Sequence, residues 1–334
     1  MLGPTERSLR FPDGATRRFA MACGSCGMLL QQGAEPGSCR RDLDSRLRAP
    51  SFVPGTDVPY GLDTYTLRTA ATAVARRLIP REGAARAELL APHGALAGQG
   101  ALLDLAPGRG GVALGLLCRP CELGAVLARL PPHALWADEV AILVDAAVAE
   151  PAPVAVEGFP EGGVRVAARP LGGDFGAQRN ALQDLALRPW MLQLDADEDI
   201  APEVGALLPA LAALADEGEA LSVGLARCNL VDGVLSAMYP DVQYRLNRVE
   251  TRYAGRVHER PALGGWQRGF ISLHGAIAHR LDGAHVRARS QRYEAMAPGR
   301  GRLEETALLL KPYEEKWGAT VLGFTCAAPA TRAP

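Results

Sequence analysis

The feature of this sequence that most constrains its fold is a series of short apolar stretches separated by amphipathic ones. Continuous apolar stretches of strand length occupy residues 112–118, 139–144, 190–194 and 222–229, and a weaker alternating stretch occupies 164–168. Strands that read as continuous apolar runs are typical of parallel sheets, in which helices cover both faces. We therefore predict an α/β domain with a mixed, mainly parallel sheet and helices on both faces.

Helical spacing of the apolar residues predicts three helices between these strands, over residues 122–130, 174–187 and 202–216. Asp174 is a favourable N-cap residue for the second helix, and Pro202 suits the first turn of the third. Alternation of strand and helix in this order favours crossover connections between parallel strands.

Composition divides the chain into three parts. Its 334 residues correspond to about two domains at roughly 150 residues each. Residues 1–99 are rich in Pro, Gly and Arg, contain one clear helical segment at 64–79, and are predicted to form a partly irregular accessory region. The α/β domain is expected over residues 100–295, with a less regular segment at about 227–293. A C-terminal helix and tail are expected over residues 296–334.

Charge and hydropathy exclude several classes of protein. The 36 basic and 37 acidic residues give a net charge of −1, so no global positive field attracts nucleic acid or an anionic membrane. No apolar run approaches the roughly 18 residues that a membrane span needs. The N-terminus has early charges and no apolar core of the kind found in secretory signals. We expect a cytoplasmic protein with no transmembrane segment and no nucleic-acid partner.

The seven cysteines include two C-x-x-C pairs, at residues 23–26 and 118–121. Zinc ribbons usually separate such pairs by about 15–20 residues, far less than the separation found here. Because Cys118 is expected on a buried strand, we predict reduced, separately placed thiols and no zinc site shared by the two pairs. A shared metal site and a redox role are the alternatives.

Acidic residues follow two of the predicted strands. Asp145 comes directly after the strand at 139–144, and Asp195 and Asp197 follow the strand at 190–194. Ligands of open α/β sheets bind at the carboxyl ends of the strands. Two carboxylates in a tight turn suit Mg²⁺ or Mn²⁺, and such a cation can neutralise a diphosphate leaving group. The alternative is a solvated acidic turn at the start of the next helix.

The residues around this turn resemble a known family. The sequence D-F-G-A-Q-R-N-A-L at 174–182, followed by W-M-L-Q-L-D-A-D-E at 190–198, resembles the family-two-type inverting glycosyltransferases of the GT-A fold. Y-R-L-N-R at 244–248, Y-A-G-R-V-H-E at 253–259 and R-S-Q-R-Y at 289–293 resemble segments of a branch that includes lipopolysaccharide-core-type sugar transferases. The resemblance covers about residues 111–293.

This resemblance implies a GT-A-like (Rossmann-like) domain that moves a sugar from a nucleotide-sugar donor to an acceptor hydroxyl, with inversion and with help from Mn²⁺ or Mg²⁺. It implies that Glu259 is the general base. The acceptor class, whether carbohydrate, lipid-linked or protein, stays open. The implied donor-binding residues are Asp145, Arg179, Asp195 and His258, and the implied metal ligands are Asp195, Asp197 and His279.

Each of these roles has an ordinary structural alternative. A loop glutamate such as Glu259 can pair with a neighbouring arginine, an arginine such as Arg179 can lie on a helix surface, and a single histidine is more often structural. Trp266 can stack on an acceptor sugar, although packing is the favoured interpretation.

Departures from the family pattern leave other functions open. C-R-P-C-E at 118–122 and A-A-V-A-E at 146–150 replace the polar segments that hold the nucleotide in the family, which suggests a degenerate, non-catalytic interaction module as an alternative. L-L-D-L-A-P-G-R-G-G at 102–111 resembles the first motif of methyltransferases that use S-adenosylmethionine. Asp145 lies too far beyond that motif to hold the ribose of this cofactor, so a methyltransferase is the less favoured alternative.

Overall fold

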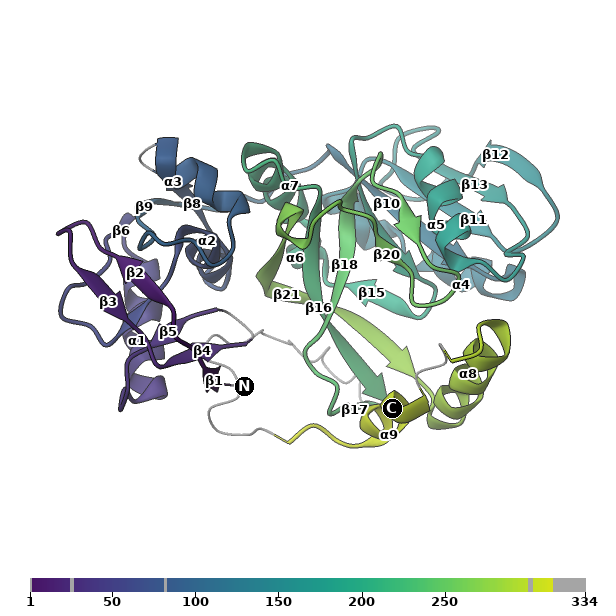
Figure 1. The fold of residues 1–334 in the computed structure, drawn as a ribbon. Helices are drawn as coiled ribbons and strands as arrows, with labels where there is room; N and C mark the ends of the chain where they lie inside the picture. Colours follow the sequence, from purple (N-terminus) through teal and green to yellow (C-terminus); the bar gives the residue numbers. More distant parts are fainter. Residues whose placement is uncertain (1, 25–26, 81–82, 300–302, 315–334) are drawn as a thin grey trace.

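The computed structural model describes residues 2–24, 27–80, 83–299 and 303–314, arranged as a small N-terminal part beside a larger sheet domain (Figure 1). Ten strands form one mixed sheet in the order β12-β13-β11-β10-β14-β18-β16-β21-β15, with β17 paired to β16. Its strands are β10 (Val112–Cys118), β11 (Val140–Val144), β12 (Ala149–Pro153), β13 (Val164–Ala168), β14 (Trp190–Asp195), β15 (Glu198–Ile200), β16 (Ser222–Val231), β17 (Val234–Leu235), β18 (Asp241–Arg248) and β21 (Gly269–Leu281).

The apolar stretches of the sequence form the parallel part of this sheet. β13, β11, β10 and β14 are neighbours in that order, and each pair is parallel. Their boundaries match the predicted stretches to within a residue at either end. The prediction of an α/β domain with parallel strands is therefore confirmed for residues 112–195.

Helices cover both faces of these strands. In β10, Val112 and Leu114 belong to one apolar core, whereas Ala113 between them belongs to the core on the opposite face with Leu182. At Gly115, an added Cβ would lie 2.6 Å from the sulfur of Met191, so a larger residue here would require that side chain to move. The helices of the first face are α4 (Leu123–Ala128), α6 (Pro202–Gly205) and α7 (Leu208–Glu217), and the helix of the second is α5 (Phe175–Asp184).

The predicted helices are present with shifted boundaries. Asp174 caps α5, since its Oδ1 accepts from the backbone nitrogen of Ala177 at 2.8 Å. The single helix predicted at 202–216 is divided into α6 and α7. The remaining short elements are the 3₁₀ turns η1 (Glu88–Leu90), η2 (Pro120–Glu122), η3 (Pro131–Leu135) and η4 (Trp266–Arg268), and the strands β19 (Tyr253–Ala254) and β20 (Arg260–Pro261).

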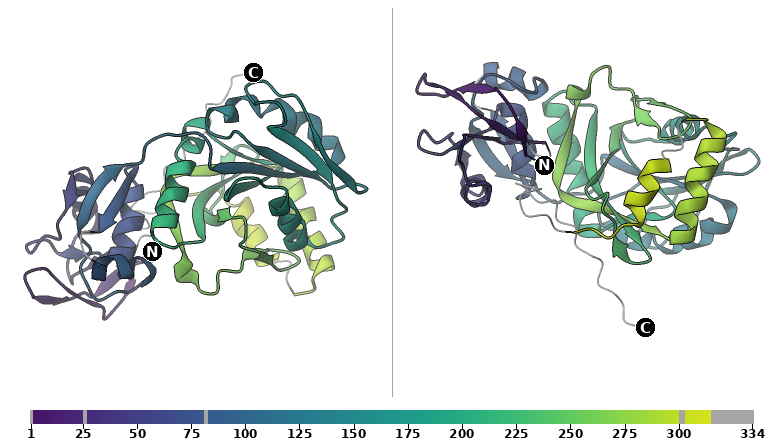
Figure 2. Two further views of the ribbon diagram at one scale, coloured as in Figure 1. Left: turned by 90° about the horizontal axis from the view of Figure 1, so that it is seen from above. Right: turned by 60° about the horizontal axis from the view of Figure 1, so that its bottom comes forward.

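The prediction of a less regular segment at 227–293 is wrong. β18 and β21 flank β16, one antiparallel and the other parallel to it, so the sheet as a whole is mixed and not mainly parallel. These strands have no continuous apolar run, because polar side chains such as Gln243 and Arg245 on β18 face a cavity. Two further helices, α8 (Gly283–Met296) and α9 (Leu303–Leu310), lie side by side next to the sheet (Figure 2).

The N-terminal part is more ordered than predicted. The helix predicted at 64–79 ends at Thr72 as α2 (Thr64–Thr72), and Leu78 and Ile79 instead pair with Leu102 and Ala101 in a three-stranded sheet. That sheet contains β6 (Ser51–Phe52), β8 (Arg76–Pro80) and β9 (Gly100–Asp104), and a four-stranded sheet contains β1 (Leu2–Pro4), β4 (Met21–Cys23), β5 (Leu29–Leu30) and β7 (Tyr60–Gly61). The other elements are β2 (Ser8–Arg10), β3 (Thr16–Arg18), α1 (Pro36–Leu47) and α3 (Gly83–Ala87).

Because β9 pairs within the N-terminal part, the change from that part to the large sheet falls after residue 104, close to the predicted boundary at 99/100. The division into functional domains stays a prediction. Residues 315–334, the predicted tail, lie outside the described residues. No helix in the described part of the chain has the length and apolar character needed to cross a membrane.

The cysteines are distributed over separate cores. Cys39 is buried in the N-terminal core and Cys118 in the core of the large sheet, and both are free thiols, as is the exposed Cys121. Cys228 is disulfide-bonded, so the prediction that every thiol is reduced is wrong for this residue. Cys26 and Cys326 lie outside the described residues, and the absence of a zinc site shared by the two pairs stays a prediction.

A buried arginine lies where the N-terminal part packs on the sheet. The hydroxyl of Tyr65 donates to the carbonyl oxygen of Gly269 at 2.6 Å, which joins α2 to the start of β21. Beside it, the fully buried guanidinium of Arg68 packs over the rings of Phe270 and Tyr65, at 4.4 and 4.9 Å, without a hydrogen bond to the described residues. Burial lowers the pKa of Arg68 to about 10, so this environment disfavours its charge.

We expect Arg68→Met to raise the free energy of unfolding by about 1–3 kcal/mol, because methionine fills the same apolar space without a buried, unpaired charge. The two ring contacts offset part of the desolvation cost in the parent. Urea unfolding measures the difference, and Arg77→Met, at a half-exposed ion pair with Glu217, is the control with a change below about 1 kcal/mol. A destabilised Arg68→Met protein would show that the ring contacts outweigh desolvation.

Candidate functional site

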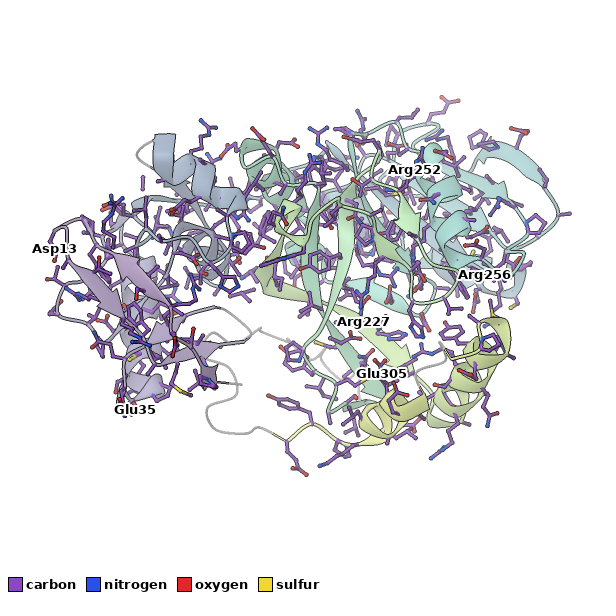
Figure 3. The ribbon with its side chains drawn as sticks, in the orientation of Figure 1. Asp13, Glu35, Arg227, Arg252, Arg256 and Glu305 are labelled. Carbon is purple, nitrogen blue, oxygen red and sulfur yellow. The ribbon has the colours of Figure 1, made fainter. Side chains whose placement is uncertain are left out.

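One cavity of about 340 Å³ lies between the sheet and the helices α8 and α9. Figure 3 shows Arg227, from β16, and Glu305, from α9, which line it from different elements. The volume suits a small-molecule ligand. All seven residues that the sequence analysis selected line this cavity: Asp145, Arg179, Asp195, Asp197, His258, Glu259 and His279.

The position of the cavity follows from the parallel strands. In register, Cys118 of β10 lies opposite Val144 of β11, and Leu117 lies opposite Asp195 of β14, so these strands end at one edge of the sheet. Asp145 follows β11 at that edge, which places it on the same cavity as Asp195. The predicted gathering of acidic residues at the carboxyl ends of the strands is confirmed.

Arg179 of α5 holds two of the selected carboxylates. Its Nη2 donates to both oxygens of Asp195, at 2.8 and 3.0 Å, and its Nε donates to Oε1 of Glu259. The side chain is only 2% exposed and lies over the ring of Tyr253. Because its guanidinium N–H groups face protein carboxylates, Arg179 positions Asp195 and Glu259. This geometry does not support the predicted contact of Arg179 with the nucleotide-sugar donor.

A second arginine, Arg245 of β18, contacts the same two carboxylates. We call Arg179, Arg245, Asp195 and Glu259 together the clamp. Its Nη2 lies 3.0 Å from Oδ2 of Asp195, and its Nη1 lies 3.8 Å from Oε1 of Glu259. Burial raises the pKa of Asp195, but Arg179 and Arg245 together lower it below its ordinary value. Asp195 is therefore a fixed anion whose oxygens are already occupied, which leaves little capacity to bind a metal.

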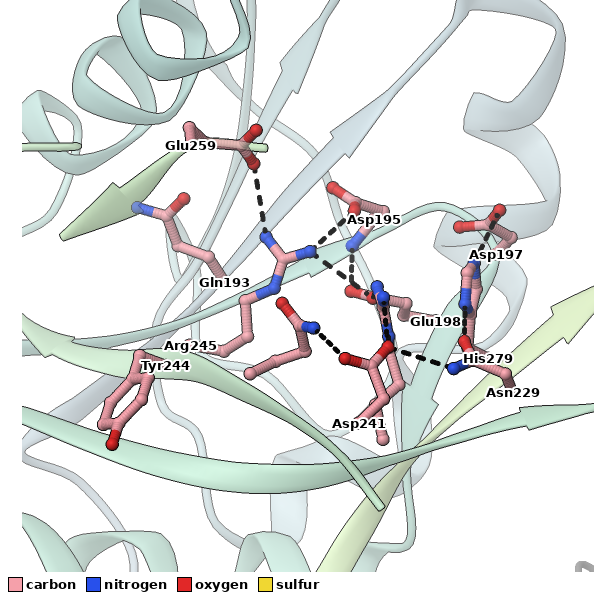
Figure 4. A network of polar contacts seen from close by, with 12 residues as sticks. Gln193, Asp195, Asp197, Glu198, Asn229, Asp241, Tyr244, Arg245, Glu259 and His279 are labelled. Carbon is pink, nitrogen blue, oxygen red and sulfur yellow. Dashed lines mark hydrogen bonds and ion pairs between the residues drawn. The ribbon is translucent and has the colours of Figure 1, made fainter. Parts of the chain in front are cut away.

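A deeper layer of ion pairs supports the clamp (Figure 4). Arg227 of β16 donates to Glu198 at 2.8 Å and to Asp241 at 2.6 Å, while Arg245 donates to Glu198 at 3.4 Å. Although burial raises the pKa of Glu198, the neighbouring Arg245 and Arg227 hold it below its ordinary value. The clamp is thus held in place by charges that contact one another across four strands.

Asp197 is the more exposed acid of the D-A-D-E turn. Its side chain is 45% exposed, and its Oδ2 lies 3.2 Å from Nε2 of the buried His279. Burial raises the pKa of Asp197, whereas the hydrogen bond from His279 lowers it, with a net decrease. His279 reaches the turn because β15 pairs with β21, which sets Glu198 directly opposite His279.

The fit of this turn to a divalent cation depends on two residues. Among the described residues, no group of three or more His, Cys, Asp or Glu is arranged to hold a metal. Asp197 and His279 nevertheless present a carboxylate and an imidazole nitrogen side by side on the cavity wall. Mg²⁺ is often bound by one or two protein ligands, with substrate phosphates and water supplying the rest. A cation at this turn would therefore need most of its ligands from a bound phosphate-bearing molecule and from water.

The remaining selected residues lie around the rim. Asp145 accepts from the backbone nitrogen of Leu171 at 2.8 Å, which fixes its carboxylate at the end of β11. His258 adopts a left-handed backbone conformation, with φ of 51°, and its ring packs edge-on against Tyr293 at 5.4 Å. Trp266 is 60% exposed and is absent from the cavity lining, so it does not stack on a ligand in this cavity.

Several charged residues in or beneath the cavity wall were not identified from the sequence. Glu198 and Arg245 lie in the segments D-A-D-E and Y-R-L-N-R, which carry the family resemblance, but the sequence did not predict an ion pair for either residue. No local sequence pattern indicates Arg227 and Asp241 as site residues, because their pairing depends on the register of β16 and β18. Arg289 and Arg292 of α8 also line the cavity, and the guanidinium of Arg289 lies over the ring of Tyr293.

No family model matches the sequence, and no curated protein matches it. Among solved structures, the chain is similar to the crystal structure of residues 1–349 of S. aureus TarS, with a TM-score of 0.27 and 12% sequence identity, over 59% of this chain and 69% of that one. A TM-score this low does not establish a shared fold.

Proposed function

We propose that this protein is a glycosyltransferase with a GT-A-like domain, which moves a sugar from a nucleotide-sugar donor to an acceptor hydroxyl with inversion. One observation carries the proposal: Asp145, the Asp195–Asp197 turn and Glu259 surround a single cavity at the carboxyl ends of parallel strands. The sequence around these residues resembles the family-two-type enzymes, and the cavity unites residues from three separate segments of that resemblance.

The donor half of the site would lie along the ends of β10, β11 and β14. Asp145 would contact the ribose or base, and Asp197 with His279 would hold Mn²⁺ or Mg²⁺ against the diphosphate. Such a cation supplies charge neutralisation of the leaving diphosphate. Arg289 and Arg292, cations on the facing wall, would add to this stabilisation where negative charge develops.

The acceptor half of the site depends on Glu259. The acceptor hydroxyl would give its proton to a carboxylate oxygen of Glu259 while its own oxygen bonds to the anomeric carbon, and the bond from that carbon to the diphosphate breaks. Attack opposite the leaving group inverts the anomeric centre. Arg179 and Arg245 would hold Glu259 in a fixed orientation, since both contact its Oε1. Carbohydrate, lipid-linked and protein hydroxyls all fit this chemistry.

The two other functions receive different support. A non-catalytic interaction module is favoured by the segment at 118–122, where Arg119 and Glu122 line the cavity but bond to each other across a short turn. The methyltransferase hypothesis needs a strand, a glycine turn and then a helix. Here Gly111 leads directly into β10, and β9 belongs to the N-terminal sheet, so this context is absent.

Ligand-dependent stabilisation tests the proposed function. We expect Mn²⁺ together with UDP or GDP to raise the melting temperature of the parent, by an amount equivalent to about 2.7 kcal/mol when the ligand is at a hundred times its Kd. Asp197→Asn should lose the Mn²⁺-dependent part of this stabilisation, because it removes the carboxylate that lies next to His279. The fold should remain, since Asp197 lies on a partly exposed turn.

Asp199→Asn is the matched control. It removes the same charge two residues away, but Asp199 faces His133 at 3.2 Å and does not line the cavity. Its ligand-dependent shift should equal that of the parent. A parent protein that none of the nucleoside diphosphates stabilises would support the interaction module instead, and stabilisation by S-adenosylhomocysteine would restore the methyltransferase hypothesis.

A further inference from the structure

One face of α8 forms a wall of the cavity. Arg289, Arg292, Tyr293 and Met296 all line it, and their spacing of i, i+3, i+4 and i+7 places them on the same side of the helix. The two guanidinium groups only donate hydrogen bonds, and the phenol of Tyr293 can donate one. This face therefore offers several hydrogen-bond donors to a ligand that is rich in acceptor oxygens.

The ring of Tyr293 is held by contacts from three segments. It packs edge-on against Phe175 of α5, with ring centroids 5.7 Å apart, and against His258 of the loop before β20, at 5.4 Å. The guanidinium carbon of Arg289 lies 5.9 Å from the centre of the same ring. Edge-to-face pairs are a favourable arrangement of aromatic rings. Tyr293 therefore has a defined position in the cavity wall.

The hydroxyl of Tyr293 is available to a ligand. It forms no hydrogen bond with another described residue, and it is not enclosed by protein atoms. Burial raises the pKa of Tyr293, and the nearby carboxylates of the clamp and of Asp197 raise it further. Arg289 lowers this pKa, but the net shift is upward. The phenol thus keeps its hydrogen at neutral pH and can act as a donor.

The donors of α8 face the same cavity as the acidic turn. Burial and His279 act most strongly on the pKa of Asp197, and Arg289 also lowers it, so Arg289 lies near this carboxylate. In the proposed function the diphosphate lies at Asp197, within reach of this side of α8. Hydrogen bonds to charged oxygens are about twice as strong as those between neutral groups. An uncharged sugar hydroxyl would gain less from this wall than a phosphate group.

We infer that Tyr293 is a ligand-contacting residue of the cavity, whose hydroxyl donates a hydrogen bond to a phosphate oxygen next to Arg289. The inference rests on the proposed function for the place of the diphosphate, but the contact needs no metal ion. The segment R-S-Q-R-Y alone does not indicate this role, because the rings that hold Tyr293 come from α5 and from the loop before β20.

Tyr293→Phe tests the inference, since phenylalanine keeps the ring contacts and lacks only the hydroxyl. We expect the affinities of the full-length protein for inorganic pyrophosphate, UDP and GDP, measured by calorimetry in metal-free buffer, to fall about ten- to a hundredfold. This is the usual contribution of a hydrogen bond to a charged group. The melting temperature without ligand should not change, because the hydroxyl has no partner among the described residues.

Tyr244→Phe is the matched control. Tyr244 is also half-buried and does not line the cavity, and Figure 4 shows its side chain directed away from the network of ion pairs. Its hydroxyl forms no hydrogen bond with another described residue either. The affinities of this variant for all three ligands should equal those of the parent.

The outcomes separate the inference from the proposed function. A parent protein that binds UDP or GDP, together with equal affinities for Tyr293→Phe, would overturn the inference alone. A lower melting temperature of Tyr293→Phe without ligand would also overturn it, because that result indicates a structural role of the hydroxyl. If the parent binds pyrophosphate as tightly as UDP and GDP, and Tyr293→Phe weakens all three, the inference holds and the nucleotide part of the proposed function is refuted. A parent that binds none of the three would refute both.

Discussion

Glu259→Gln should reduce sugar transfer by about a hundred- to ten-thousandfold, which is the usual cost of removing a positioned general base. Glutamine keeps the shape of the side chain and can still accept hydrogen bonds from Arg179 and Arg245, but it cannot take the proton of the acceptor hydroxyl. Donor binding should change little, because Asp145, Asp197 and His279 are unaltered. Initial rates of transfer and a titration of nucleoside diphosphate, both on the same preparation, measure the two quantities.

Glu250→Gln is the control for this loss of charge. Glu250 lies at the end of β18 in an exposed ion pair with Arg248 and does not line the cavity, so transfer should be unaffected. A Glu259→Gln enzyme with the rate of the parent would contradict the role of Glu259 as a base. A variant that loses donor binding to the same extent as transfer would move Glu259 to the binding part of the site.

The sequence predicted strands well where the side chains on both faces of the strand are buried. β10, β11 and β14 could be predicted closely because each is a continuous apolar run, and Asp145 and Asp195 could be placed together because parallel strands share their carboxyl ends. The same reasoning failed for β18 and β21. Their residues alternate between the core and the cavity, and polar residues that face a cavity resemble those of an exposed loop.

The candidate site shows the same division between local and long-range information. The D-A-D-E turn is contiguous, so its acids could be selected from the sequence. The partners that decide what each acid can do come from distant strands: Arg245 on β18 fixes Asp195, and His279 on β21 contacts Asp197. Only the register of the sheet separates an acid held by arginines from one available to a cation.

This distinction makes Arg179 the residue whose removal should cost the fold most. We expect Arg179→Met to lower the free energy of unfolding by about 3–5 kcal/mol, because breaking a buried ion pair leaves the carboxylates of Asp195 and Glu259 without their closest cation. Arg252→Met is the control, since its ion pair with Asp184 is exposed, and the loss there should not exceed about 1 kcal/mol. Urea unfolding at pH 7 measures both.

The pH dependence of this loss identifies its cause. The folded pKa of Asp195 is lowered by Arg179 and Arg245, so the stabilisation from its ion pairs is complete above the unfolded pKa of about 3.9 and disappears as the pH falls through the folded value. Arg179→Met lacks the larger part of that stabilisation already at neutral pH, so the variant has less stability to lose when Asp195 is protonated. The difference between parent and variant should therefore be largest at neutral pH and shrink below about pH 4. A difference that stays constant down to acid pH would show that Arg179 stabilises the fold by packing on Tyr253, and that Asp195 does not depend on it for its charge.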